Sequence, residues 1–209
     1  GADVTGVGTA RQNLASASYG GDKAIVAYGN SGSLSNLSNL VSNSGVVATD
    51  TTGVGTARAD MAGVKYGSDK AIFAYGYSNQ NLSLSNLVTS LGVVGTDVSG
   101  VGTARETQAA PYGVDTAAAA YGQGDSGYLN VKNLINNSGV VGADVSGVGT
   151  ARYGVGSAGY GGDKGIFAYG ATGSILSMSN LMNNVGVIAA DVSGVGTARR
   201  YGVAAGYST

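Results

Sequence analysis

The sequence contains no cysteine, no histidine and no tryptophan, and only one proline among its 209 residues. Without cysteine, the chain can form neither disulfide bonds nor thiolate sites. The joint absence of cysteine and histidine removes the usual ligands of zinc, copper and haem. It also excludes catalysis by a Ser-His-Asp or Cys-His arrangement within this chain. We therefore expect no metal site and no cofactor.

Charge is also scarce, because only 11% of the residues are charged and the net charge is −1. A nucleic-acid-binding protein needs a basic face, so this balance argues against nucleic acid as a partner. No apolar run approaches the roughly 18 residues of a membrane-spanning helix, and we expect no membrane insertion. Because 43% of the residues are hydrophobic, the composition favours a folded chain over a disordered one.

An internal repeat of 47 residues organises the whole sequence. The string GVGTAR begins at Gly6, Gly53, Gly100, Gly147 and Gly194. Related strings ending in AYG recur with the same step, apart from one shifted by a single residue in the third unit. Such self-similarity indicates one structural unit stacked several times. We expect a single repeat domain over 1–209, with units 12–58, 59–105, 106–152 and 153–199 and partial units 1–11 and 200–209.

Most of the charged residues follow this repeat as well. Two recurrent sets are the acids and bases Asp50, Arg58, Asp97, Arg105, Asp144, Arg152, Asp191 and Arg199. One active site does not need several copies of the same residue, so we interpret these sets as structural. We expect ion pairs between units, or hydrogen bonds to the backbone of neighbouring units.

The apolar runs are short and are flanked by glycine, serine, asparagine and aspartate, which is typical of strands. Four such strands in each 47-residue unit predict an all-β, β-propeller-like array of about 4.4 four-stranded repeats. A β-solenoid and a mixed α/β repeat array are the alternatives.

One segment of each unit is ambiguous between helix and strand. Leu84, Leu87, Val88 and Leu91 have the i, i+3, i+4, i+7 spacing of an amphipathic helix, and Gly92 follows as a helix cap would. The same segment in the first unit also fits a hairpin with a three-residue turn that ends in glycine. Serine and asparagine are poor helix formers, which favours the hairpin.

The order of these features resembles the kelch repeat of β-propellers. The resemblance rests on Arg58, a small-residue strand before Tyr66, and AIFAYG with Tyr75-Gly76 where a kelch repeat has two glycines. The tryptophan usual after the third kelch strand is missing. The sequence also resembles tandem repeats in predicted tail-fibre or appendage proteins of environmental bacteriophages, through the strings NLVSNSGVVATD, TTGVGTAR and GSDKAIFAYG. This second resemblance implies a location on a virion or an extracellular surface appendage.

The units differ most in two places, after the repeated arginine and between the second and third expected strands. In a propeller blade these loops lie on one face, and variable loops on a constant scaffold are typical of binding surfaces. Tyrosine rings and side-chain amides suit sugar recognition. The candidate ligand-binding residues are Tyr77, Asn79, Gln80, Asn81, Asp125 and Tyr128. We expect a non-enzymatic module that attaches to a host-surface glycan or receptor.

Two other functions fit the sequence. The chain could be a purely architectural filament or sheath subunit without a ligand. It could also be a glycan-degrading enzyme, which needs two carboxyl groups about 5–10 Å apart. The acids outside the repeat pattern are Asp60, Glu106 and Asp125. Because the number of repeats is not whole and strand edges attract pairing, we also expect self-association or pairing with other copies or a longer chain.

Overall fold

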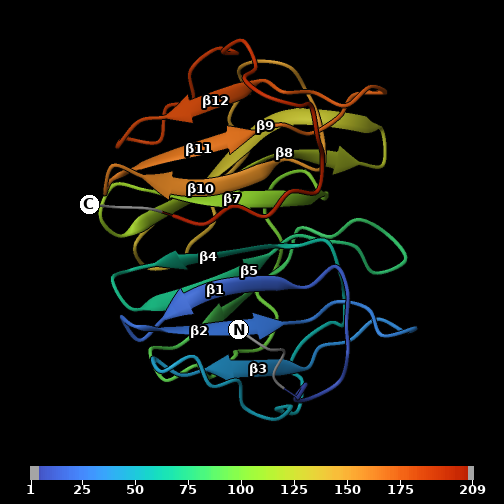
Figure 1. Ribbon diagram of the computed structural model, residues 1–209, viewed down its shortest axis with the longest axis vertical. Coiled ribbons are helices and arrows are strands. Elements are labelled where there is room, and N and C mark those ends of the chain that lie inside the picture. Colours follow the sequence, from blue (N-terminus) through green and yellow to red (C-terminus); the bar gives the residue numbers. More distant parts are fainter. Residues whose placement is uncertain (1–4, 207–209) are drawn as a thin grey trace.

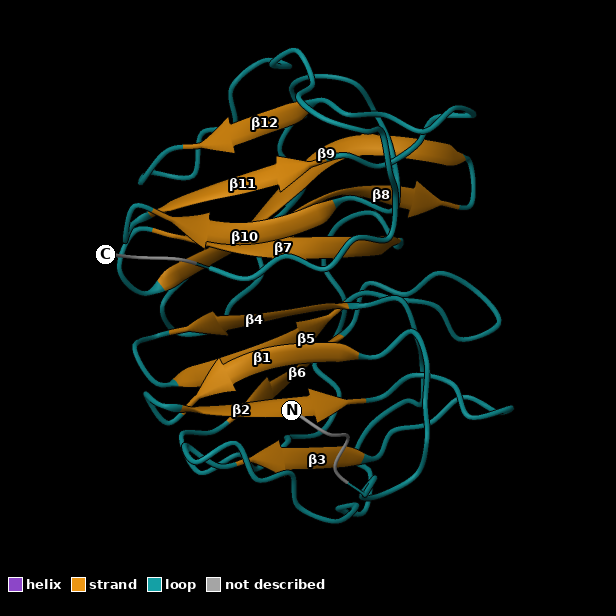
Figure 2. Ribbon diagram, in the orientation of Figure 1, coloured by secondary structure: helices purple, strands orange, loops and turns teal. Residues whose placement is uncertain are grey.

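A computed structural model describes residues 5–206 as four antiparallel sheets of three strands each (Figure 1). The first sheet consists of β1 (Ala15–Tyr19), β2 (Lys23–Ala27) and β3 (Ser38–Val41), and the second of β4 (Ala62–Tyr66), β5 (Lys70–Ala74) and β6 (Ser85–Val88). The third consists of β7 (Glu106–Tyr112), β8 (Thr116–Gly124) and β9 (Gly127–Ile135), and the fourth of β10 (Gly156–Tyr160), β11 (Lys164–Ala168) and β12 (Ser179–Met182). The described residues contain no helix, which confirms the all-β prediction and excludes the mixed α/β alternative for them (Figure 2).

The ambiguous segment of each unit is a strand followed by a turn. In the first unit, Gly45 has a φ of +78°, and the Ser42 amide donates to the Val46 carbonyl at 2.9 Å. Gly92 adopts the same left-handed conformation in the second unit, with a φ of +80°. This conformation suits glycine, which has no Cβ. The structure thus confirms the prediction of a hairpin turn for this segment and excludes the helix.

The fourth strand expected in each unit is not a regular strand. After β3, the chain pairs with that strand through isolated bridges, at Val41–Val47 and at Ser38–Thr51, rather than through a continuous ladder. The Asn39 side chain holds this outer segment instead, because its Nδ2 donates to the Ala48 carbonyl at 3.1 Å and to Asp50 Oδ1 at 2.9 Å. A side chain has replaced part of the backbone ladder. Equivalent bridges occur in the other three units, so each comprises three strands and an irregular outer segment.

The four sheets stack in chain order through their first strands. Strand β1 packs on β4, β4 on β7 and β7 on β10, and separate hydrophobic clusters fill the three junctions between successive sheets. In Figure 1, β1 and β4 face β7 and β10 across the middle of the molecule, while β3 and β12 lie at opposite ends. Alanine, glycine and serine make up more than half of the residues of the first strands, which allows this close approach.

A buried arginine connects each pair of successive sheets. The Arg58 guanidinium lies 4.3 Å from the centre of the Tyr28 ring in the first sheet. Its Nε donates to the Tyr75 carbonyl of the second sheet at 2.9 Å. Arg105 and Arg152 repeat this arrangement at the next two junctions, and all three arginines are 0% exposed. We call this arrangement the arginine clamp.

The recurrent aspartates bind a threonine rather than the arginine at most junctions. Both the amide and the hydroxyl of Thr56 donate to the Asp97 carboxylate, the hydroxyl at 2.7 Å. Asn86 Nδ2 also donates to this carboxylate, at 2.9 Å. Among the described residues, one pair of the two predicted sets reaches ion-pair distance, with 4.0 Å between Arg152 Nη1 and Asp191 Oδ1. Hydrogen bonds therefore carry most of the polar connection between units.

Candidate functional site at the mouth of the central cavity

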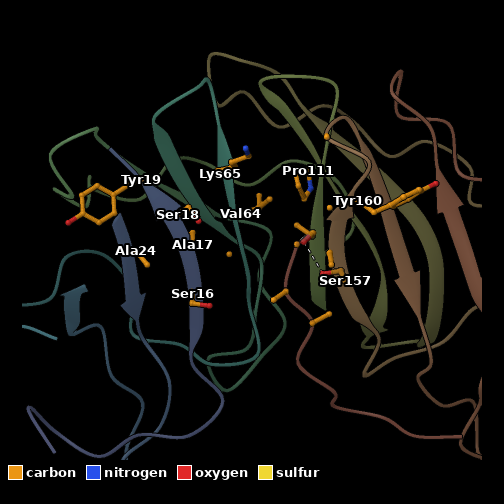
Figure 3. A pocket seen from close by; sticks show the side chains of 18 of the residues that line it. Ser16, Ala17, Ser18, Tyr19, Ala24, Val64, Lys65, Pro111, Ser157 and Tyr160 are labelled. Atoms are coloured by element: carbon orange, nitrogen blue, oxygen red, sulfur yellow. Dashed lines mark hydrogen bonds between the residues drawn. The ribbon is translucent and has the colours of Figure 1, made fainter. Parts of the chain in front are cut away.

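The first strands of all four sheets surround a central cavity of about 620 Å³. Figure 3 shows the side chains that line it, among them Ser16 of β1, Lys65 of β4, Pro111 of β7 and Tyr160 of β10. The Ser157 hydroxyl donates to the Ala109 carbonyl at 2.8 Å, which ties β10 to β7 within the cavity wall. Short side chains on the first strands leave this space open between the sheets.

A second cavity of about 370 Å³ continues the first toward the loops that enter the first strands. Ser16, Gly63, Ala109 and Ser157 line both cavities, so together they form one central channel. We call the end formed by the second cavity the channel mouth. It includes Asp60, Glu106, Tyr153 and Tyr201 among its lining residues.

The channel mouth is assembled by residues that occupy one repeat position in successive units. The Asp60 amide donates to the Asn13 carbonyl at 3.1 Å, and the Thr107 amide to the Asp60 carbonyl at 3.4 Å. The Tyr201 amide donates to the Gly154 carbonyl at 2.8 Å. These backbone contacts link the start of each first strand to its neighbour. They bring side chains that are 47 residues apart in sequence to one opening.

Two carboxyl groups share this opening. Burial raises the pKa of Asp60, although a hydrogen bond from Asn13 Nδ2 at 3.3 Å acts to lower it. Burial also raises the pKa of Glu106, and the charge of Asp60 raises it further. Both effects favour the protonated acid. The two carboxyls are therefore close enough to influence each other, and both hold their protons to a higher pH than a solvated acid.

Three tyrosines form a row that leads from the start of β9 into the channel mouth. The rings of Tyr128 and Tyr153 are stacked, with their centres 4.9 Å apart and an angle of 10° between the planes. Tyr201 meets Tyr153 edge-on, with 5.9 Å between the ring centres. The Arg200 guanidinium lies 5.6 Å from the Tyr153 ring centre and 5.4 Å from that of Tyr201. The row combines exposed ring faces with a fixed positive charge.

The candidate residues from the sequence occupy the same side of the molecule. Tyr77 and Ala59 exchange backbone hydrogen bonds of 2.8 and 3.0 Å, so the loop between the second and third strands adjoins the loop that enters the first. Asn81 Nδ2 donates to Asp125 Oδ1 of the next unit at 2.6 Å.

The remaining candidates differ in how far they join the channel mouth. Tyr128 stacks on Tyr153 there. Asn79 and Gln80 are exposed at the loop tip, where Asn79 has a φ of +60°. The structure thus pairs Asn81 with Asp125 of the next unit. Separately, it places Tyr128 against Tyr153 at the channel mouth.

Tyr153, Tyr201 and Arg200 belong to the site, but the sequence analysis did not select them. A signal for them exists in the repeat. The position directly after the repeated arginine is different in every unit, and so is the position that follows it. The first of these positions is occupied by Gln12, Ala59, Glu106, Tyr153 and Arg200, and the second by Asn13, Asp60, Thr107, Gly154 and Tyr201.

No protein-family model matches this sequence, and no curated protein matches it significantly. Within residues 5–206, no group of three or more acidic side chains is arranged to hold a metal ion. A search of the same residues for a helix long and apolar enough to span a membrane found none. The site is therefore interpreted from its own geometry.

Proposed function

We propose that the protein is a non-enzymatic binding module of a virion tail fibre or other extracellular surface appendage, which attaches to a host-surface glycan or receptor at the channel mouth. One observation carries this proposal. The second position after the repeated arginine differs in every unit, and all five of its residues line a single opening, together with Glu106 and Tyr153 from the first position. A constant scaffold with variable residues at one mouth is how repeat proteins build specific binding surfaces.

The chemistry of the channel mouth suits a saccharide. Tyr128 and Tyr201 expose ring faces on which the apolar face of a sugar can stack. The Asp60 and Glu106 carboxyls accept hydrogen bonds from sugar hydroxyls, and Asn13 and Arg200 donate to ring and glycosidic oxygens. A cavity of about 370 Å³ accommodates a small ligand such as one or two sugar units.

We further propose that the four sheets form a kelch-like, β-propeller-like array. The support comes from the first strands, which surround one channel, and from the arginine clamps between successive sheets. A propeller places its binding loops around the end of such a channel. Self-association, or pairing with a longer chain, belongs to the same proposal.

A glycan array probed with the purified protein tests the binding proposal. We expect a signal from a restricted set of glycans. Replacing Tyr201 with alanine should weaken the signal about tenfold, because a stacking platform is lost. The matched control is Tyr160→Ala, which removes a tyrosine from the cavity at the far end of the channel and should leave binding unchanged. Tyr77→Ala tests the loop tip separately.

The array has three outcomes that would contradict the proposal. No signal on any glycan would favour the purely architectural filament or sheath subunit. Equal losses in Tyr201→Ala and Tyr160→Ala would indicate loss of folding. A loss in Tyr77→Ala alone would move the site from the channel mouth to the loop.

A second candidate function is glycan cleavage, which one observation favours. Asp60 and Glu106 share the channel mouth, and both have raised pKa values. A glycosidase needs one carboxyl that remains protonated as a general acid and a second as base or nucleophile. Incubation of bound glycans with the protein, followed by assay of new reducing ends, tests it. Cleavage abolished by Glu106→Gln, with binding retained, would establish the enzyme.

A further inference from the structure

We propose that the open edge of the fourth sheet is a docking surface for one more strand pair of the repeat's own type, donated by a second polypeptide. The open edge consists of Tyr169, Val195, Thr197, Arg199 and residues 201–206. This proposal concerns assembly and does not depend on the glycan proposal. It rests on the continuity of this edge with the three junctions inside the molecule.

Half of a fourth arginine clamp is present at the open edge. The Arg199 guanidinium lies 4.5 Å from the centre of the Tyr169 ring, which matches the stacking at the three internal junctions. Arg58, Arg105 and Arg152 are completely buried, whereas Arg199 is exposed. Its Nε donates to the Thr197 carbonyl at 3.1 Å, in place of the tyrosine carbonyl of a following sheet. The clamp therefore lacks its second sheet.

The residues around Arg199 are exposed in the same way. Val195 is 83% exposed, whereas Val148 at the same repeat position is 39% exposed. Thr150 donates its amide and hydroxyl to the Asp191 carboxylate of the following sheet. Thr197 occupies the same repeat position at the open edge. A donor chain with an aspartate at the equivalent place would complete this contact.

An extended segment at the repeat position of a first strand already lies beside β10, although it is not a regular strand. The Tyr201 amide bonds to the Gly154 carbonyl at 2.8 Å, and the Gly202 carbonyl oxygen lies 3.2 Å from an ideal Cβ position on Gly156. Residues 202–206 therefore run beside β10. Residues 204–206 line the central cavity, which β1 also lines. What the open edge lacks is the second and third strands, which β11 and β12 supply in the fourth unit.

The opposite edge of the molecule shows the complementary half of the clamp. Arg11 Nη1 donates to the Leu37 carbonyl of its following sheet at 2.6 Å, and Nη2 contacts Asn39. Its Nε is buried and has no hydrogen-bond partner. At the internal junctions, the tyrosine of the preceding sheet stacks on the guanidinium of the equivalent arginine. A strand pair whose first strand ends in AYG would place such a tyrosine over Arg11.

These contacts define the donor chemically. It is an antiparallel pair with an apolar strand ending in Tyr-Gly, an asparagine in the next strand and an aspartate eleven residues later, as in Asn180 and Asp191. The four strand pairs of the described chain are all engaged in their own sheets. The donor is therefore none of these four pairs. We assign it to a second polypeptide, and the extended chain described below tests the alternative in which the pair follows in the same chain.

A labelled peptide with the sequence of residues 161–193 tests the proposal by fluorescence anisotropy with the full chain. We expect saturable binding below about 100 μM. The Arg199→Gln chain should bind at least about tenfold more weakly, because the lost hydrogen bonds involve a charged donor. Lys70→Gln is the matched control, because Lys70 is exposed at the start of β5 in the second sheet, outside the open edge, and it should bind as the parent does.

Two further measurements keep the test decisive. Hydrogen exchange of the complex should show new protection at residues 194–199. A chain extended after residue 206 by a second copy of residues 160–199 should melt at a higher temperature than the parent. No peptide binding, equal binding by Arg199→Gln, or protection elsewhere would overturn the proposal. If the extended chain is stabilised but the peptide does not bind, the claim that a second polypeptide donates the strand pair is overturned.

Discussion

At the scale of single residues, the arginine clamp explains how so few charges hold the sheets together. Arg105 Nε donates to the Tyr121 carbonyl at 3.0 Å, and its Nη2 donates to Asn133 at 2.8 Å. The Tyr75 ring lies 4.3 Å away. A buried charge is costly unless its donors are satisfied, and here carbonyls and an aromatic face satisfy them. The clamp therefore couples two sheets through one side chain.

Replacing Arg105 with glutamine should lower the free energy of unfolding by about 3 kcal/mol or more, because buried acceptors lose their donor. The matched control is Arg199→Gln, where the arginine stacks on Tyr169 but is exposed, and the loss should stay below about 1 kcal/mol. Urea denaturation followed by circular dichroism measures both. Equal effects of the two substitutions would show that burial of the clamp does not matter.

The acids make opposite contributions to pH dependence. Burial, and then the charge of Asp60, raise the pKa of Glu106 above its ordinary value of 4.5. The folded chain therefore binds this proton more tightly than the unfolded chain does. The stabilising contribution is present below pH 4.5 and is lost as the pH rises through the raised pKa. Glu106→Gln should melt above the parent at pH 7, with the difference shrinking toward pH 4.

Asp97 provides the control of opposite sign. Burial acts to raise the pKa of Asp97, but hydrogen bonds from Thr56 and Asn86 outweigh it and lower this pKa below the ordinary 3.8. Its contribution is present above pH 3.8 and is lost as the pH falls through the lowered pKa. Asp97→Asn should melt below the parent at pH 7, and the difference should fade in acid. Differential scanning fluorimetry from pH 3 to 8 distinguishes the two profiles.

At the scale of elements, the turn after the second strand of each sheet is closely constrained. In the second unit, Tyr75 and Gly76 both have positive φ, at +65° and +103°. A Cβ on Gly76 would lie 2.6 Å from the Ala59 carbonyl oxygen and 2.9 Å from Met61 Cβ. The chain passes this point so closely that only glycine fits. The turn therefore fixes where the loop face meets the first strand.

Gly76→Ala should destabilise the protein by about 1–3 kcal/mol more than Gly32→Ala, because overpacking adds to backbone strain. The two glycines have nearly the same φ, +103° and +101°, but a Cβ on Gly32 would meet nothing within 4 Å. The difference between the variants thus isolates the close approach. It is measured by thermal unfolding in parallel, and equal melting temperatures would contradict the prediction.

At the scale of the whole molecule, the main packing contacts between sheets join sheets that are adjacent in chain order. Stability in such an array is a sum of unit and junction terms, and terminal units open first. The identical strings GVGTAR at residues 100–105 and 194–199 allow a direct comparison. The first is enclosed by two sheets, and the second lies at the open edge.

Hydrogen exchange should be slower at residues 100–105 than at residues 194–199. The Thr103 amide donates to the Asp144 carboxylate at 3.0 Å, and Arg105 is buried beside it. Because the two strings have the same sequence, their intrinsic exchange rates match closely. Mass spectrometry of the two peptides from one digest gives the ratio of protection. Equal protection would show that the edge is not the weak end of the stack.

The local sequence was sufficient for part of the fold. The apolar runs predicted the strands, and the glycine after NLVSNS correctly predicted a turn. The prediction of a regular fourth strand was wrong. The Asn39 side chain makes hydrogen bonds to the outer segment that a backbone ladder would otherwise make. The repeated arginines make contacts between successive units. Their acceptors were mainly carbonyls rather than aspartates, which spacing alone does not reveal.

The sequence by itself determined the length of the unit, its strands and the residues that vary from one unit to the next, because all of these are local or periodic properties. The tertiary structure decided which variable residues meet. Asp60, Glu106, Tyr153 and Tyr201 come from four different units, and they share one opening only because the tertiary fold brings the starts of the first strands together. The relative placement of successive sheets is set by packing across their junctions, and no single unit encodes it.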